Sequence, residues 1–266
     1  MDKKQVVFFD LDGTLLTSEL KVASSSIEAI HKLQELGVEP VIATGRTIME
    51  IGYVMEETGI RSCVAMNGQY VIYEGELIYE NPLDATEVKA LHEGSSRNGH
   101  ELAFYNAENI TVTAGESELI TKNYQRVGGV YPPIDDRLYL NETIHQMLIF
   151  CEEGEENYYQ ERFPYFQFVR NSPFGCDIYP AGTSKATGIE RLLSIKNISR
   201  ESTYAFGDGL NDLEMFELVA TPIAMGNALD NVKKAAKYVT HTHDEDGILN
   251  GLFMCGLLDS KLFINF

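Results

Sequence analysis

Apolar and polar residues follow one another in a pattern that predicts alternating strands and helices in the first third of the chain. Short apolar runs predict strands, and longer segments with apolar residues three or four apart predict amphipathic helices. Strands are expected at residues 5–9, 39–44 and 63–66, and helices at 24–37 and 47–58. Serines at the start and Gly37 at the end indicate that the first helix is capped. Residues 70–80 alternate around Glu74-Gly75 and predict a β-hairpin.

The last third of the chain has the same rhythm. Helices are expected at residues 184–195, 211–219, 227–236 and 247–258, and strands at 203–206, 221–225 and 238–240. Strands that alternate with helices predict a parallel sheet that is covered on both faces.

The middle of the chain breaks this rhythm. It is richer in tyrosine, phenylalanine and charge, and it contains the loop-like stretches YPPIDD and EEGEEN. Strands are expected there near residues 101–106, 145–150 and 166–170. We therefore predict an α/β protein with a Rossmann-like core formed by residues 1–81 and 180–266. An α+β domain, residues 82–179, is expected to split this core.

Composition narrows the classes of function. The net charge of −19 argues against binding to nucleic acid or to an anionic membrane, because both reward positive charge. The four cysteines form no C-x-x-C pair, so neither a zinc module nor a disulfide framework is indicated. The apolar run at residues 6–9 is too short for a signal peptide, and no segment is long enough to span a bilayer. We expect a cytoplasmic protein.

Polar residues follow several of the predicted strands at the point where each strand ends. Asp10 and Asp12 follow the first strand, Thr44-Gly45-Arg46 follows the second, and Asp208 and Asp212 follow the strand at 203–206. A single Asp or Thr there is often only a turn or cap residue. Ligands, however, bind at the carboxyl ends of parallel strands, where carboxylates from both ends of the chain would meet. Four such carboxylates would repel one another unless a cation lay among them, and Mg²⁺ suits hard oxygen ligands.

Lys185 lies in the first turn of the helix predicted at residues 184–195. The helix dipole disfavours a cation at this end. One interpretation is a solvated lysine. The functional interpretation is a positive charge directed at a phosphate held at the helix N-terminus.

These residues lie in motifs that resemble those of a known family. In chain order, DLDGTLL, TGR, the lysine of GTSKATGI, and GDGLNDLEM resemble the four motifs of the haloacid dehalogenase (HAD)-like phosphatases. The NG after the third strand, the long insertion and the AMGNA sequence are similar to the Cof-type subgroup with a type IIB cap. One departure is Ala186, where the subgroup usually has Gly.

The resemblance implies that Asp10 is the nucleophile, which attacks phosphorus to give an aspartyl-phosphate. Asp12 would protonate the leaving oxygen and then activate the hydrolytic water. Mg²⁺ would bind the Asp10 carboxylate, the backbone carbonyl of Asp12 and Asp208. Thr44 and Lys185 would stabilise the charge on the phosphoryl group.

The resemblance also implies a substrate-binding set around these residues. The set comprises Gly45, Arg46, Asn67, Gly68 and Asn211. Gly45 would donate its N–H to the phosphoryl group, and Asn211 would contact the phosphate or a metal-bound water. Arg46 could face the substrate or pair on the surface. Asp212 would orient Lys185 or the surroundings of the metal.

The function that we expect is a Mg²⁺-dependent phosphatase acting on small phosphorylated metabolites, such as sugar phosphates, in a monomer or homodimer. The cap would close over the substrate and exclude water. Two alternatives remain open at this stage. A sugar phosphomutase would return the phosphoryl group to sugar rather than to water. A non-catalytic metabolite-binding regulator would bind phosphate esters without consuming them, although it would have no need of a nucleophile beside an acid.

Overall fold

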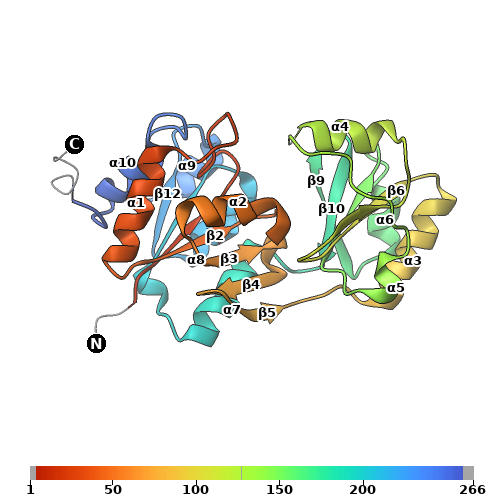
Figure 1. The fold of residues 1–266 in the computed structure, drawn as a ribbon, viewed down its shortest axis with the longest axis horizontal. Coiled ribbons are helices and arrows are strands. Elements are labelled where there is room, and N and C mark those ends of the chain that lie inside the picture. The colour runs from red at the N-terminus through yellow and green to blue at the C-terminus, as the bar shows by residue number, and fades with distance from the viewer. Residues whose placement is uncertain (1–3, 127, 260–266) are drawn as a thin grey trace. The chain divides into compact units, whose positions relative to one another are not determined.

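A computed structural model describes residues 4–126 and 128–259 of the chain. Within these residues the chain separates into two compact units (Figure 1). One unit, the core, contains residues 4–46, 50–79 and 184–259, and the other, the cap, contains residues 47–49 and 80–183. The fold is α/β, with a mainly parallel core sheet and an inserted antiparallel cap sheet, as predicted.

The core is built on an eight-stranded sheet with the order β13-β12-β11-β1-β2-β3-β4-β5. The strands are β1 (Val6–Phe9), β2 (Glu39–Ala43), β3 (Ser62–Ala65), β4 (Tyr70–Tyr73), β5 (Glu76–Glu80), β11 (Thr203–Gly207), β12 (Thr221–Ala224) and β13 (Tyr238–Val239). From β13 to β3 the neighbouring strands are parallel, and β4 is antiparallel to β3. All four residues of β1 are buried, as expected for the central strand of a sheet that is covered on both faces.

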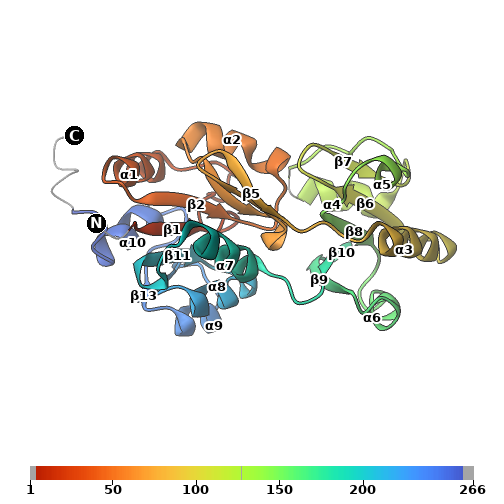
Figure 2. The same cartoon turned by 90° about the horizontal axis from the view of Figure 1, so that it is seen from below.

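Helices cover both faces of the core sheet. They are α1 (Ser24–Glu35), α2 (Ile48–Thr58), α7 (Lys185–Lys196), α8 (Leu213–Leu218), α9 (Asp230–Ala235) and α10 (Gly247–Met254), with 3₁₀ turns η1 (Met66–Gly68), η2 (Arg200–Ser202) and η3 (Leu210–Asp212). Figure 2 shows α1 and α2 on one side of the sheet and α7, α8 and α9 on the other. The parallel strands and their crossover helices therefore form a three-layer core.

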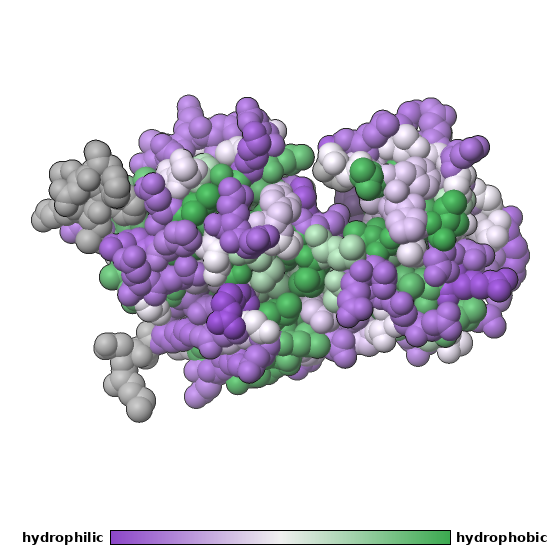
Figure 3. All heavy atoms as spheres, viewed as in Figure 1, coloured by the Kyte–Doolittle hydropathy of each residue, from purple (hydrophilic) through white to green (hydrophobic). Residues whose placement is uncertain are grey.

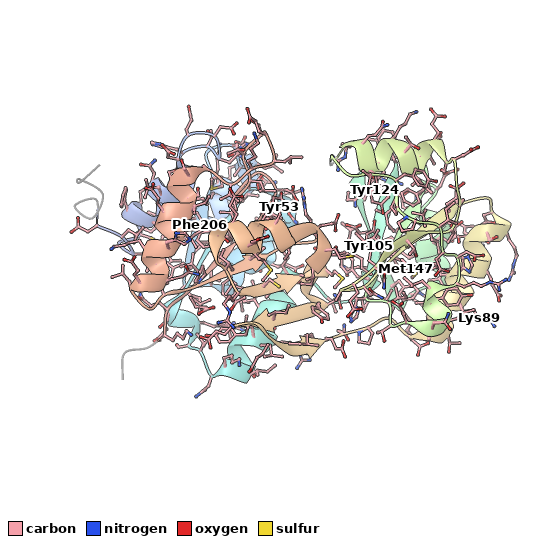
Figure 4. The ribbon with its side chains drawn as sticks, in the orientation of Figure 1. Tyr53, Lys89, Tyr105, Tyr124, Met147 and Phe206 are labelled. Carbon is pink, nitrogen blue, oxygen red and sulfur yellow. The ribbon has the colours of Figure 1, made fainter. Side chains whose placement is uncertain are left out.

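The cap is a five-stranded antiparallel sheet with helices on both faces. The sheet order is β7-β6-β8-β10-β9. Its elements are α3 (Ala85–Arg97), β6 (Glu101–Tyr105), β7 (Ile110–Val112), α4 (Glu118–Arg126), α5 (Leu138–Asn141), β8 (Gln146–Phe150), α6 (Asn157–Arg162), β9 (Phe166–Ser172) and β10 (Gly175–Pro180). Residues of α3, α5 and α6 pack on one face, and residues of α4 pack on the other. There Tyr105 of β6 meets Tyr124 of α4, with 2.7 Å between their hydroxyl oxygens (Figure 4).

The predicted hairpin at residues 70–80 is confirmed. Glu74 and Gly75 both have positive φ, 52° and 87°, which is the backbone that a two-residue hairpin turn requires. The predicted serine cap of α1 is wrong, because the N-cap residue is Ala23 and the serines occupy the first helical turn. Two helices begin later than predicted: residues 210–212 form a 3₁₀ turn before α8, and α9 begins only at Asp230. In the cap, β7 and β10 lie outside the predicted strands.

The surface drawn in Figure 3 is largely hydrophilic, with smaller hydrophobic areas between the hydrophilic ones. The four cysteines are free thiols, as the sequence predicted, and three of them are buried. None of the helices in residues 4–126 and 128–259 combines the length and the apolar character that a membrane span requires.

Candidate active site

The site lies where the strand order of the core sheet reverses. The chain runs from β1 to β2 and β3 on one side, and β11, β12 and β13 lie on the other. Asp10 follows β1 and Asp208 follows β11, so two neighbouring parallel strands deliver both carboxylates to one edge of the sheet. The ring of Phe206 (Figure 4) stacks on Phe9 at 5.3 Å, and the Asp10 N–H donates to the Phe206 carbonyl at 3.0 Å. The ends of β1 and β11 are therefore held together next to the residues that carry the carboxylates.

Lys185 joins carboxylates from both ends of the chain. It is the first residue of α7, and its side chain is only 1% exposed. Its Nζ donates to Asp10 Oδ1 and to Asp212 Oδ1, the latter at 2.8 Å. This pairing offsets the cost of placing a cation at a helix N-terminus, the feature that singled out Lys185 in the sequence.

Several charged side chains lie close together in this site, and their proximity and burial shift the pKa values of Asp10, Lys185 and Asp208. Burial raises the pKa of the Asp10 carboxyl well above its ordinary value, the Asp212 and Asp208 carboxylates act in the same direction, and Lys185 opposes them. Burial likewise raises the pKa of Asp208. For Lys185, burial acts to lower the pKa, but the charges of Asp10 and Asp212 outweigh it and the pKa is raised. The negative charge of the cluster thus exceeds what one lysine neutralises.

Asp212 and Asp208 differ in what their carboxylates already bind. Asp212 is fully buried, and its Oδ2 accepts the backbone N–H groups of Asp208 and Gly209, both at 3.0 Å. Its Oδ1 accepts Lys185, so both oxygens are engaged within the protein. Asp208 accepts the Thr14 hydroxyl through Oδ1 at 2.9 Å and is partly exposed. Asp212 therefore organises the loop, and Asp208 is the more available ligand.

The donor set fits a divalent cation. Asp10, Asp208 and Asp212 each offer a carboxylate oxygen, and these three atoms lie within 4.8 Å of one another. Carboxylate oxygens are hard donors, which suit a cation such as Mg²⁺ better than a softer metal. Since the Asp212 oxygens are already bonded, Asp10 and Asp208 are the better direct ligands.

Asp12 is not part of the buried carboxylate cluster and pairs with Arg46. The Arg46 guanidinium donates Nε to Asp12 Oδ2 at 2.9 Å and Nη2 to Asp12 Oδ1 at 2.5 Å. The Asp12 side chain is 55% exposed, against 16% for Arg46. The two residues lie on the loops after β1 and β2, and the Thr44 hydroxyl fixes the second loop by accepting the Arg46 N–H at 3.1 Å.

The Asn67-Gly68 pair lies beside the loop after β2. The Asn67 N–H donates to the Thr44 carbonyl at 3.1 Å, and a Cβ on Gly45 would lie 3.2 Å from both amide heteroatoms of Asn67. Gly68 has a φ of 94°, and a Cβ there would collide with the Ser184 carbonyl. Gly68 thus lets η1 approach the start of α7.

The expected site residues therefore form three groups. Asp10, Asp208, Asp212 and Lys185 make the buried cluster, Asp12 pairs with Arg46, and Thr44, Gly45, Asn67 and Gly68 line the neighbouring loops. Asn211 is exposed on η3. Two residues that support the site were missed: Thr14, within DLDGTLL, and Asn227, within AMGNA, whose Nδ2 donates to the Gly13 carbonyl at 2.8 Å. Their motifs were visible in the sequence, but the partners of these side chains were not.

Known proteins match this chain over nearly its whole length. A family model described as haloacid dehalogenase-like hydrolase matches residues 7–252. The Bacillus subtilis protein named "Putative phosphatase YkrA" is 36% identical over 97% of this chain and all of its own length. A hypothetical protein from Geobacillus kaustophilus HTA426 has a similar crystal structure, with a TM-score of 0.92, 42% identity and coverage of 96% of this chain and 100% of the other.

A third similar protein is the HAD subclass IIB sugar phosphatase BT4131. Its structure matches with a TM-score of 0.82 and 32% identity, over 96% of this chain and all of the other. The family match and the full-length relatives lead to one conclusion: the chain belongs to the haloacid dehalogenase-like hydrolases and is an enzyme of their phosphatase class.

Proposed function

We propose that this enzyme is a Mg²⁺-dependent phosphatase that hydrolyses small phosphate monoesters, such as sugar phosphates, through an aspartyl-phosphate. The observation that carries the proposal is the crowding of Asp10, Asp208 and Asp212 around a single buried lysine. Such a cluster is costly for a protein that only binds ligands. It suits a site that brings a nucleophile, a cation and an anionic substrate together.

Asp10 and Asp12 divide the chemistry. An Asp10 oxygen attacks phosphorus, the bond from phosphorus to the ester oxygen breaks, and Asp12, in its protonated carboxylic acid form, gives its proton to that oxygen and becomes a carboxylate. A water then attacks the phosphorus of the aspartyl-phosphate, and Asp12 takes the proton from this water. The bond from phosphorus to Asp10 breaks, and inorganic phosphate leaves.

The other residues hold charge and orientation. Mg²⁺ bound by the carboxylates of Asp10 and Asp208 and the carbonyl of Asp12 would screen the repulsion between nucleophile and phosphate. Lys185 and the Thr44 hydroxyl would bind phosphoryl oxygens, with Gly45, Asn67 and Asn211 as further donors. Asp212 supports the proposal because it already orients Lys185 and the Asp208 loop.

The test is phosphate release from a panel of sugar phosphates and an aryl phosphate, with Mg²⁺ and with EDTA. Wild type is compared with Asp10→Asn and with Asp84→Asn as a matched control. Asp84 caps α3 by accepting the N–H groups of Thr86 and Glu87, and Asn caps a helix as well as Asp does. We expect release only with Mg²⁺ and only when Asp10 is present. Wild-type rates in Asp10→Asn would overturn the nucleophile assignment.

The same panel separates the alternatives. A phosphomutase would convert one sugar phosphate isomer into another without accumulation of free phosphate. A binding protein would take up an ester stoichiometrically and return it unchanged. Either result would replace the phosphatase proposal.

A further inference from the structure

The loop after β12 contacts both loops that carry the aspartates. On one side, Asn227 Nδ2 donates to the Gly13 carbonyl at 2.8 Å. On the other, the Leu229 N–H donates to the Asp208 carbonyl at 3.1 Å. Five residues of chain, 225–229, therefore link the loop after β1 to the loop after β11.

The Asn227 amide is held at both ends. Its Nδ2 donates to the Gly13 carbonyl, and its Oδ1 accepts the His243 N–H at 3.0 Å. Only one orientation of the amide satisfies both bonds, because a carbonyl requires a donor and an N–H requires an acceptor. The side chain is thus a fixed brace rather than a mobile surface group.

The brace acts where the backbone has little freedom. Gly13 has a φ of 77°, and a Cβ there would collide with the Asp208 carboxylate. The next residue, Thr14, donates its hydroxyl to Asp208 Oδ1 at 2.9 Å. A rotation of the Gly13 peptide would therefore shift Thr14 away from Asp208 and turn the neighbouring Asp12 carbonyl.

We propose that Asn227 is a positioning residue, which fixes the Asp12–Thr14 backbone against Asp208 so that both loops keep one geometry for the cation and the substrate. This inference rests on the proposed function. Asn227 itself needs no contact with the substrate. A displacement of about 1 Å in such a site can cost on the order of 100-fold in rate, so a single well-placed amide can matter.

Two substitutions test the brace. Asn227→Asp keeps the shape and the acceptor for His243 but places an oxygen against the Gly13 carbonyl. Asn227→Ala removes the brace without adding charge. The matched control is Asn250→Asp, since Asn250 Nδ2 makes the same kind of bond to the Asp246 carbonyl at 2.9 Å on α10.

For each variant, kcat and KM are measured for the best ester, and Mg²⁺ affinity is measured by calorimetry without substrate. Thermal unfolding reports the folded fraction. We expect both Asn227 variants to lose about 10- to 100-fold in kcat with KM changed less than about 3-fold, and to bind Mg²⁺ about 10-fold more weakly. Asn250→Asp should match wild type in kcat, in KM and in Mg²⁺ affinity.

Unchanged kcat and Mg²⁺ affinity in Asn227→Ala would overturn the proposal. A loss that only follows the unfolded fraction, or that Asn250→Asp shares, would overturn it too. If wild type released no phosphate, the proposed function would fail, but the Mg²⁺ calorimetry would still decide whether Asn227 positions the two loops.

Discussion

Arg46 holds Asp12 by two parallel hydrogen bonds, at 2.9 and 2.5 Å, across the loops after β1 and β2. Because the Asp12 side chain is 55% exposed, the pair adds little to stability, about 0–1 kcal/mol. Its planar, two-point geometry nevertheless fixes the direction of the Asp12 carboxylate. The pair therefore bears on catalysis more than on folding.

We expect Arg46→Met to lower kcat about 10-fold, to leave KM within about 3-fold and to change the unfolding free energy by less than about 1 kcal/mol. Arg46→Lys should recover little activity, because lysine cannot reproduce a bidentate contact. Steady-state kinetics on both variants tests this. A large rise in KM with kcat preserved would instead assign Arg46 to the substrate phosphate.

Asp10 has a raised pKa, so its ionisation weakens the fold without a divalent cation. The unfolded pKa is about 3.9, and the stability present below that pH is lost as the pH rises toward the folded pKa. Asn at this position does not ionise. In EDTA, the unfolding free energy of Asp10→Asn should therefore increase relative to that of wild type as the pH rises from about 4 to 8. The increase should be at most about 1.4 kcal/mol per pH unit.

Urea denaturation at several pH values, with EDTA and then with Mg²⁺, measures this difference. The pH-dependent gain of Asp10→Asn should shrink with Mg²⁺, because the cation offsets the charge in wild type and the variant lacks a ligand. A stability difference between the two proteins that stays constant in EDTA from about pH 4 to 8 would contradict the raised pKa.

Lys185 is the buried cation between Asp10 and Asp212. Removing one partner of a buried ion pair typically costs about 3–5 kcal/mol, so Lys185→Met should lose that much stability in EDTA. Lys32→Met is the control, since Lys32 pairs with Glu35 at 2.6 Å on the exposed side of α1 and should change stability by less than about 1 kcal/mol. Equal losses in urea denaturation would mean that Lys185 does not stabilise the cluster.

Gly188 lets α7 cross η1 closely. A Cβ on Gly188 would lie 2.6 Å from Gly68 Cα and 2.6 Å from Val64 Cγ1. We expect Gly188→Ala to destabilise the core by about 1–3 kcal/mol. Gly52→Ala on α2, where a Cβ has no neighbour within 4 Å, should stabilise by up to about 1 kcal/mol. Denaturation curves with the same sign for both would refute the close-crossing argument.

Arg170 organises one end of the cap. It donates to both carboxylate oxygens of Glu156, to the carbonyls of Cys151, Glu152 and Ser172, and to the Cys151 thiol. Arg170→Met leaves these acceptors unsatisfied and should cost about 2–3 kcal/mol. Arg162→Met is the control, because the Arg162 side chain is 50% exposed and lies over the Tyr158 ring, and it should change stability by less than about 1 kcal/mol. Thermal unfolding that does not distinguish the two variants would contradict this role.

The sequence by itself determined the class of the fold. In the core, local patterns sufficed, because short buried strands and amphipathic helices alternate, and each reports its own structure. In the cap, β7 and β10 were missed for a local reason. β7 is only three residues long, and β10 contains Gly175, Asp177 and Pro180, which are residue types depleted in strands. The late starts of α8 and α9 have a tertiary cause. The side chains of Asp212 and Asn227 bond to neighbouring loops, and such contacts do not appear in the periodicity of the sequence.

The candidate site was likewise predictable only in part. Motif spacing singled out Asp10, Lys185 and Asp208, because each follows a strand or opens a helix. Only the tertiary structure decided their partners. Asp10 and Lys185 are 175 residues apart, Asn227 and Gly13 are 214 apart, and Arg46 faces Asp12 across two loops. Such pairings depend on the order of strands in the sheet, because this order decides which residues lie beside the end of each strand. The local sequence around a strand does not encode the order.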